Sequence, residues 1–153
     1  MRPALAKLAA RLGDCRGVLV DSNILLDIAT NDPKWAAWSS QALAVCAEHS
    51  ALIINPIIYA EASIGFKTIE ALNAALPSGI YERAQLPCEA GFLAGKCFLD
   101  YRKRGGQPTT AMPDFYIGAH ATIDQLALLT RDDARYRTCF PKIEVLAPQM
   151  DLK

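Results

Sequence analysis

The sequence predicts an α/β fold, a three-layer sandwich with a central, mostly parallel sheet of about five strands. Short runs of apolar and β-branched residues alternate with longer segments of helical periodicity along the whole chain. Such alternation favours a parallel sheet, because each connection between parallel strands crosses over through a helix. The length of 153 residues and a hydrophobic fraction of 52% suit one domain with one sizeable core.

The strands are predicted from the apolar runs. The first is the run Val18-Leu19-Val20, which stops abruptly at Asp21. The predicted strands are residues 17–20, 51–54, 82–86, 126–130 and 143–146.

The helices are predicted from 3.6-residue periodicity and from their end signals. Asn55-Pro56 is a helix start, because Asn caps and Pro at the first helical position loses no hydrogen bond. Gly105-Gly106 is a helix end. The predicted helices are residues 23–29, 35–49, 57–66, 69–76, 87–104 and 113–125, with a short helical or irregular stretch before Pro141.

The chain divides into three expected parts. They are an N-terminal extension with a short helix (1–16), the main domain (17–148) and a C-terminal tail (149–153). Leu5, Leu8 and Leu12 share one helical face of this first part, which is therefore either a short docking helix or an extension ahead of the domain. Lys7 and Arg11 interrupt its apolar residues, so it does not resemble a secretory signal. No apolar stretch is long enough to span a membrane.

Composition and charge limit three properties of the chain: how it could bind nucleic acid, the state of its cysteines and its capacity for a zinc site. The formal net charge is zero, so any nucleic-acid binding must come from a local patch. The five cysteines form no C-x-x-C pair and read as free thiols of a cytoplasmic protein; they are Cys15, Cys46, Cys88, Cys97 and Cys139. With only His49 and His120, a Cys/His zinc site has few candidates.

Four acids map to the same edge of the predicted sheet. Asp21 ends the first strand, Glu61 lies early in the helix after the second, Asp114 opens its helix, and Asp132 follows the fourth strand. In a parallel sheet the carboxyl ends of strands and the following helix starts share one edge. Each acid also has an ordinary explanation: Asp21 as an Asx cap, Asp114 as a dipole-complementing acid, Asp132 as a turn residue and Glu61 as a solvated side chain.

The four acids taken together point to a metal site. Clustered carboxylates raise one another's pKa and cost stability, which a divalent cation offsets. Hard oxygen ligands suit Mg²⁺, with Mn²⁺ as a substitute. Such an ion polarises a phosphoryl oxygen, so the implied chemistry is phosphodiester hydrolysis. The hydroxyl of Ser22 either positions a water or phosphate or caps the next helix.

Four motifs resemble those of PIN-domain ribonucleases, in particular the VapC-type toxins of type II toxin–antitoxin systems. The motifs are Val20-Asp21-Ser22-Asn23-Ile24-Leu25-Leu26-Asp27, Asn55-Pro56-Ile57-Ile58-Tyr59-Ala60-Glu61, Pro113-Asp114-Phe115-Tyr116-Ile117-Gly118-Ala119-His120-Ala121 and Leu129-Thr130-Arg131-Asp132. Their order and spacing fit over residues 17–148, which leaves the first sixteen residues as an addition to the family pattern.

The resemblance implies an Mg²⁺-dependent endoribonuclease that acts on RNA. It implies a metal site of Asp21, Glu61, Asp114 and Asp132, with support from Ser22, Asn23 and Thr130. It also implies a homodimer and a cognate antitoxin protein that occupies the cleft. Asp133 competes with Asp132 for its role, and Asp132 is favoured because it directly follows the Thr-Arg pair.

Basic and aromatic side chains outside the acidic set are further candidates for binding. Arg131, Arg135 and Arg137 lie beside the proposed site and are RNA-backbone candidates. The run Arg102-Lys103-Arg104 is better explained as the basic end of a helix. His120 is expected in the core or on the surface rather than in catalysis. The aromatic residues at helical spacing are expected to be core or dimer contacts; they are Trp35, Trp38, Phe92 and Phe98.

Rival functions follow from the same motifs. A phosphatase of the haloacid dehalogenase type has an Asp after its first strand, but needs a second Asp where this chain has Asn23. A nucleotide-binding module lacks its Gly-rich loop here. Two alternatives stay open: a chromosomal PIN-domain RNA-processing nuclease, and a non-catalytic RNA-binding or interaction module on the same fold.

Overall fold

The computed structural model describes residues 3–107 and 112–148, so the predicted tail 149–153 lies outside the described residues. The strands are β1 (Val18–Val20), β2 (Leu52–Ile54), β3 (Tyr81–Arg83), β4 (Ala127–Leu129) and β5 (Val145–Leu146). The helices are α1 (Pro3–Ala10), α2 (Ser22–Ala29), α3 (Ala36–His49), α4 (Pro56–Ala62), the 3₁₀ turn η1 (Ser63–Gly65), α5 (Ile69–Ala75), α6 (Cys88–Lys103), α7 (Pro113–Ile123) and α8 (Ala134–Cys139).

The five strands form one sheet in the order β3-β2-β1-β4-β5, and every described pairing is parallel. The predicted α/β class is therefore confirmed. The third strand begins one residue earlier than predicted and ends three residues earlier, because Tyr81–Arg83 pairs with the three residues of β2. β1 is the central strand, with β2 on one side and β4 on the other.

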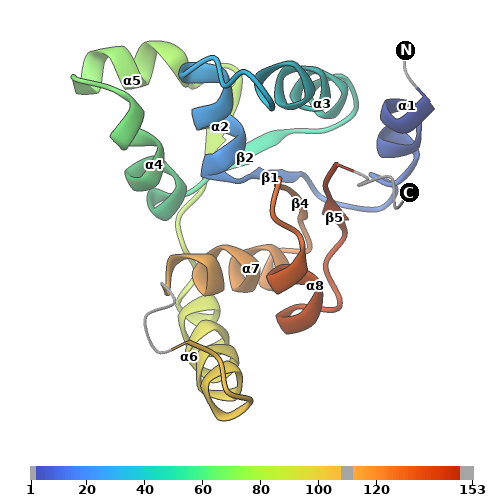
Figure 1. Ribbon diagram of the computed structural model, residues 1–153, viewed down its shortest axis with the longest axis vertical. Helices are drawn as coiled ribbons and strands as arrows, with labels where there is room; N and C mark the ends of the chain where they lie inside the picture. The colour runs from blue at the N-terminus through green and yellow to red at the C-terminus, as the bar shows by residue number, and fades with distance from the viewer. Residues whose placement is uncertain (1–2, 108–111, 149–153) are drawn as a thin grey trace.

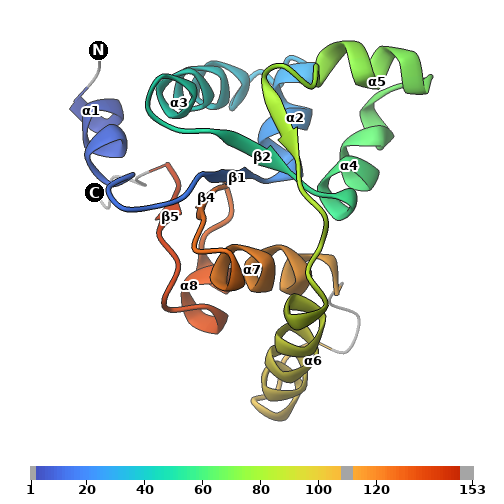
Figure 2. The ribbon, with the colours of Figure 1, turned by 180° about the vertical axis from the view of Figure 1, so that it is seen from behind.

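Helices cover the sheet on both faces (Figures 1 and 2). α1, α2 and α3 lie on one face, and α6, α7 and α8 lie on the other. α4 contacts both α2 and α7. β1, β2 and β4 are buried along their whole length, as strands between two helical layers must be.

The start of α4 follows the sequence signal. The side chain of Asn55 accepts a hydrogen bond of 2.9 Å from the backbone N–H of Ile58, and Pro56 takes the first helical position. The amide of Asn55 also contacts Nδ1 of the fully buried His120, which ties the end of β2 to α7. His120 is thus a core residue. The helix ends at Ala62 and passes into η1, four residues before the predicted end.

α1 packs onto the main domain. Leu5, Leu8 and Leu12 are buried in the common core, and α1 contacts α3. Arg11 forms an ion pair of 2.5 Å with Glu144 and donates a hydrogen bond of 2.9 Å to the carbonyl of Val145. The segment before β1 therefore shares the hydrophobic core instead of projecting from it.

The aromatic predictions hold only in part. Trp38 and Phe98 pack against the core. Trp35 is not a core residue: it is half-buried next to two cations, Lys34 and Arg131. Phe92 is not a core residue either, because it lies on the outer side of α6 and is 71% exposed. Dimer contacts remain a prediction for both.

Among the described residues, no helix is long and apolar enough to cross a membrane.

Candidate active site

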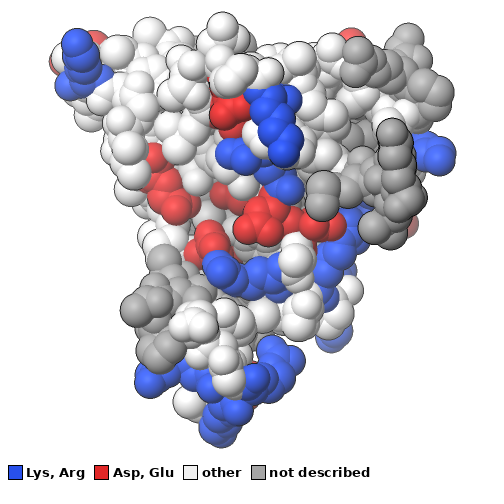
Figure 3. Space-filling model, viewed as in Figure 1, with Lys and Arg blue, Asp and Glu red and all other residues white. Residues whose placement is uncertain are grey.

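Three strands and the elements that follow them bring the predicted acids to one place. β1 lies where the strand order reverses, which is where parallel sheets open a crevice at the carboxyl edge. Asp21 follows β1, Glu61 is in α4 after β2, and Asp132 follows β4. Asp114 is in the first turn of α7. Figure 3 shows acidic side chains gathered on this side of the molecule, with basic side chains above and below them.

Asp21 is buried, with 4% of its surface exposed. Its Oδ2 accepts hydrogen bonds from Thr130 Oγ1 at 2.7 Å, Tyr136 Oη at 3.3 Å and Asn23 Nδ2 at 3.4 Å. Asp21 is the N-cap residue of α2, but its side chain makes no capping hydrogen bond, so the Asx-cap explanation is wrong. Burial is the main cause that raises the pKa of Asp21 to about 6, and the charge of Asp114 adds to it.

Ser22 joins two of the acids. Its hydroxyl lies 3.1 Å from Glu61 Oε1 and 3.4 Å from Asp21 Oδ1. Burial raises the pKa of Glu61, the hydrogen bond from Ser22 lowers it, and the charges of Asp21 and Asp114 raise it further. Ser22 is the first residue of α2 and not its N-cap, so the capping role is wrong. Its hydroxyl lies between two carboxylates instead.

Asp114 receives two donors from α8. Arg135 forms an ion pair with its Oδ2, and the hydroxyl of Tyr136 lies 3.4 Å from its Oδ1. Burial raises the pKa of Asp114, Arg135 lowers it, and the charge of Asp132 raises it. A carboxylate with an arginine partner still has a raised pKa, which indicates how unfavourable negative charge is at this position.

The loop after β4 supports the centre of the site. Thr130 is fully buried and also accepts from Asn23 Nδ2 at 3.1 Å and from the backbone N–H of Asp132 at 3.2 Å. Asp132 itself is exposed, and its charge reaches Asp114. The neighbouring Asp133 instead pairs with Arg137 at 2.7 Å. The structure thus engages Asp133 elsewhere and leaves Asp132 beside the acids.

The three arginines proposed to bind RNA each contact an acid. Arg135 contacts Asp114 and Arg137 contacts Asp133. Arg131 forms an ion pair with the buried Asp27, with 2.8 Å between Nε and Oδ2. The Nε–H group of Arg131 makes no hydrogen bond to any described residue.

Asp27, the last residue of the first motif, lies in α2. It is only 2% exposed, and it also accepts a hydrogen bond of 2.7 Å from Ser39. Its carboxylate therefore holds Arg131 beside the site and ties α2 to α3 and to the loop after β4.

Tyr136 is the contact that sequence reasoning missed. It lies in α8, is 3% exposed and brings its hydroxyl within hydrogen-bond distance of two acids. The stretch around it has no strong periodicity, and a tyrosine between arginines carries no signal of its own. Only the docking of α8 against α7 places it.

The donor set fits a divalent cation in its chemistry. All candidate ligands are oxygens, and burial together with mutual repulsion raises the pKa values of Asp21, Glu61 and Asp114. In the described part of the chain, no three His, Cys, Asp or Glu side chains lie close enough together to enclose an ion, and Asp114 is engaged by Arg135. A cation at this place would compete with Arg135.

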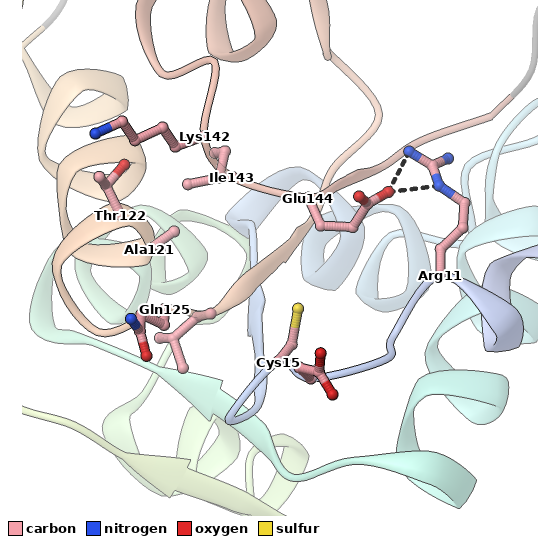
Figure 4. Close-up of a pocket in the computed structure, with 10 residues that line it drawn as sticks. Arg11, Cys15, Ala121, Thr122, Gln125, Lys142, Ile143 and Glu144 are labelled. Carbon is pink, nitrogen blue, oxygen red and sulfur yellow. Dashed lines mark hydrogen bonds and ion pairs between the residues drawn. The ribbon is translucent and has the colours of Figure 1, made fainter.

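A separate cavity of about 520 Å³ lies at the opposite edge of the sheet. Its lining comes from segments that precede β1, β4 and β5, which are the amino ends of parallel strands. Figure 4 shows Arg11 and Glu144 paired beside it, with Cys15 near them. None of the four acids lines this cavity, so it is not part of the candidate active site.

Comparison with known proteins connects this geometry to a fold. No protein-family model and no curated protein sequence matches the chain. Solved structures do match: a chain of the crystal structure of VapBC2 from Rickettsia felis bound to a DNA fragment from their promoter has a TM-score of 0.68, at 18% identity over 86% of this chain and 98% of that one. The chain has a VapC-like PIN fold.

Two further structures share the PIN fold. A chain of VapBC-1 from nontypeable Haemophilus influenzae has a TM-score of 0.64, at 19% identity over 85% of this chain and 96% of that one. A chain of FitAcB from Neisseria gonorrhoeae has a TM-score of 0.62, at 17% identity over 86% of this chain and 97% of that one. The predicted resemblance is therefore confirmed for the fold.

Proposed function

We propose that this chain is an Mg²⁺-dependent endoribonuclease, the toxin of a type II toxin–antitoxin pair, acting in the cytoplasm as a homodimer that a cognate antitoxin inhibits. The observation that carries the proposal is the buried Asp21, with a pKa raised to about 6, in one cluster with Asp114 and Glu61. The similar folds occur in structures of VapBC, of FitAcB and of a toxin–antitoxin complex from Klebsiella pneumoniae, which supports the toxin and antitoxin parts.

Asp21, Glu61, Asp114 and Asp132 would hold the ion. When bound, Mg²⁺ supplies a Lewis acid for the scissile phosphate and lowers the pKa of a bound water. Mn²⁺ satisfies the same oxygen ligands and would substitute for it.

The remaining side chains orient these acids and attract the substrate. Thr130 and Asn23 donate to Asp21 Oδ2, which fixes the orientation of that carboxylate. Ser22 does the same for Glu61. Arg135 and Arg137 are partly exposed next to the acids, and they would neutralise RNA phosphates as these approach.

RNA cleavage by the purified chain tests the nuclease proposal. We expect cleavage with millimolar Mg²⁺ or Mn²⁺, and none with EDTA. Asp114→Asn should lower the rate by roughly 100-fold or more, because loss of the ion removes several kcal/mol of transition-state stabilisation. The control is Asp100→Asn, an exposed acid of α6, which should cleave like the wild type. Equal cleavage by Asp114→Asn, or cleavage that persists in EDTA, would refute the proposal.

Growth of a bacterial host tests the toxin proposal separately. Induction of the wild type should arrest growth, and induction of Asp21→Asn should not. Co-expression of an antitoxin encoded beside the chain should restore growth, and light scattering should give the mass of a dimer. Equal growth with wild type and variant, in spite of RNA cleavage in vitro, would favour an RNA-processing nuclease over a toxin.

A further inference from the structure

The hydroxyl of Tyr136 lies between two acids that come from different elements. Its oxygen is 3.3 Å from Asp21 Oδ2, at the end of β1, and 3.4 Å from Asp114 Oδ1, in α7. The tyrosine itself belongs to α8 and is buried in the core. This one hydroxyl therefore connects three segments of the chain at the centre of the acidic cluster.

The chemistry of a phenol suits this position. It has one hydrogen to donate, and the two carboxylate oxygens lie at nearly equal distances from it. Burial and the charges of Asp21, Asp114 and Glu61 all raise the pKa of Tyr136 above its usual value, so the hydroxyl stays neutral. A neutral donor placed between two carboxylates offsets part of their repulsion without adding a charge of its own.

We propose that Tyr136 is a positioning residue for the metal site, whose hydroxyl holds the carboxylates of Asp21 and Asp114 toward each other so that one divalent ion can bind both. This inference rests on the proposed function. It assigns to α8 a role in assembling the site, and it makes the hydroxyl rather than the aromatic ring the functional group.

The alternative is that Tyr136 only fills the core. Its ring is part of the hydrophobic cluster, and phenylalanine would fill the same space. A buried hydroxyl whose contacts are as long as 3.3 and 3.4 Å adds little to stability by itself. Removal of the hydroxyl alone therefore separates the two roles, because packing is retained while the contact to the acids is lost.

Arg135, the preceding residue, provides a contrast on the same helix. It holds the other oxygen of Asp114 through an ion pair and is partly exposed. As a cation it competes with a metal ion for that carboxylate, whereas a neutral hydroxyl does not. Adjacent residues of α8 are thus expected to have opposite effects on metal affinity.

The test measures the binding of Mg²⁺ and Mn²⁺ to the RNA-free protein, by calorimetry and by the rise in melting temperature with metal. Tyr136→Phe should weaken binding about 10-fold or more, as loss of a partner that orients a metal ligand does. Its melting temperature in EDTA should stay close to that of the wild type. Arg135→Gln should bind at least as tightly as the wild type. The control is Tyr81→Phe, which removes the hydroxyl of a buried tyrosine on β3, and its affinity should be unchanged.

The outcomes separate this inference from the proposed function. If the wild type binds the ions and Tyr136→Phe binds them equally well, Tyr136 is a packing residue and the inference is overturned while the metal site stands. If Tyr136→Phe and Arg135→Gln weaken binding to the same extent, a general disturbance of α8 explains the loss, which also overturns it. If the wild type binds neither ion, both the proposed function and this inference fail.

Discussion

Asp21→Asn is expected to stabilise the metal-free protein. The carboxylate of Asp21 is 4% exposed, and its strongest neighbour of the same sign is Asp114. The substitution removes the charge and keeps the shape. The amide oxygen can take the place of Oδ2 and accept from Thr130 and Tyr136, while the amide nitrogen faces the hydroxyl of Ser22.

The magnitude follows from the pKa of Asp21, which is raised from 3.8 to about 6. A shift of this size, at about 1.4 kcal/mol per unit, means that the charged form destabilises the folded state by about 3 kcal/mol at about pH 7.5. In a chain of 153 residues each kcal/mol changes the melting temperature by about 2–4 °C. We therefore expect Asp21→Asn to melt roughly 6–12 °C above the wild type in EDTA.

The effect of the Asp21 charge on folding stability changes with pH in a direction that its raised pKa determines. The folded state binds the proton of Asp21 more tightly than the unfolded state, so stability of the wild type rises as pH falls through about 6 toward 3.8. Above about pH 6 the cost is nearly complete, and at about pH 5 roughly half of it is relieved. The difference between wild type and Asp21→Asn should shrink accordingly.

Urea unfolding in EDTA at about pH 7.5 and about pH 5 measures both the stability gain of Asp21→Asn and its decrease at lower pH. The matched control is Asp27→Asn, because Asp27 is also a buried acid and lies six residues further along the chain, in α2. Asp27 has an arginine partner, so its neutralisation should destabilise the protein, by about 1–3 kcal/mol, and leave Arg131 without its acid. If Asp21→Asn is no more stable than the wild type at pH 7.5, or its advantage is as large at pH 5, the reasoning about Asp21 is refuted.

Three further predictions test the packing and the thiols. Gly118→Ala should destabilise the protein by about 1–3 kcal/mol in urea unfolding, because its methyl group would lie 2.3 Å from an aromatic ring, whereas Gly95→Ala has open space and should be neutral or stabilising. Leu8→Ala should cost about 2–4 kcal/mol, which an unchanged urea midpoint would contradict. Burial raises the pKa of Cys46 to about 12, so iodoacetamide at about pH 8 should modify the exposed Cys88 and spare Cys46 in the folded protein, as mass spectrometry will show.

Local signals were sufficient for the elements whose ends are chemically marked. Asn55 and Pro56 predicted the start of α4 because capping involves only neighbouring atoms. The end of that helix was placed too late, since its passage into a 3₁₀ turn at Ser63 depends on the packing of α4 against its neighbours. The half-buried Trp35 and the exposed Phe92 lie outside the core for a related reason: helical spacing shows which residues share a face, but not which face is covered.

The sequence by itself determined the alternation of strands and helices, and hence the arrival of Asp21, Glu61, Asp114 and Asp132 at one edge of a parallel sheet. It did so because the direction of parallel strands places residues that follow them at the same edge of the sheet, and this does not depend on which side chains surround them. The tertiary structure alone decided what each acid contacts, including the position of Tyr136 between two of them. Contacts across more than a hundred residues of chain, such as that of Thr130 with Asp21, depend on how whole elements pack, which no local pattern records.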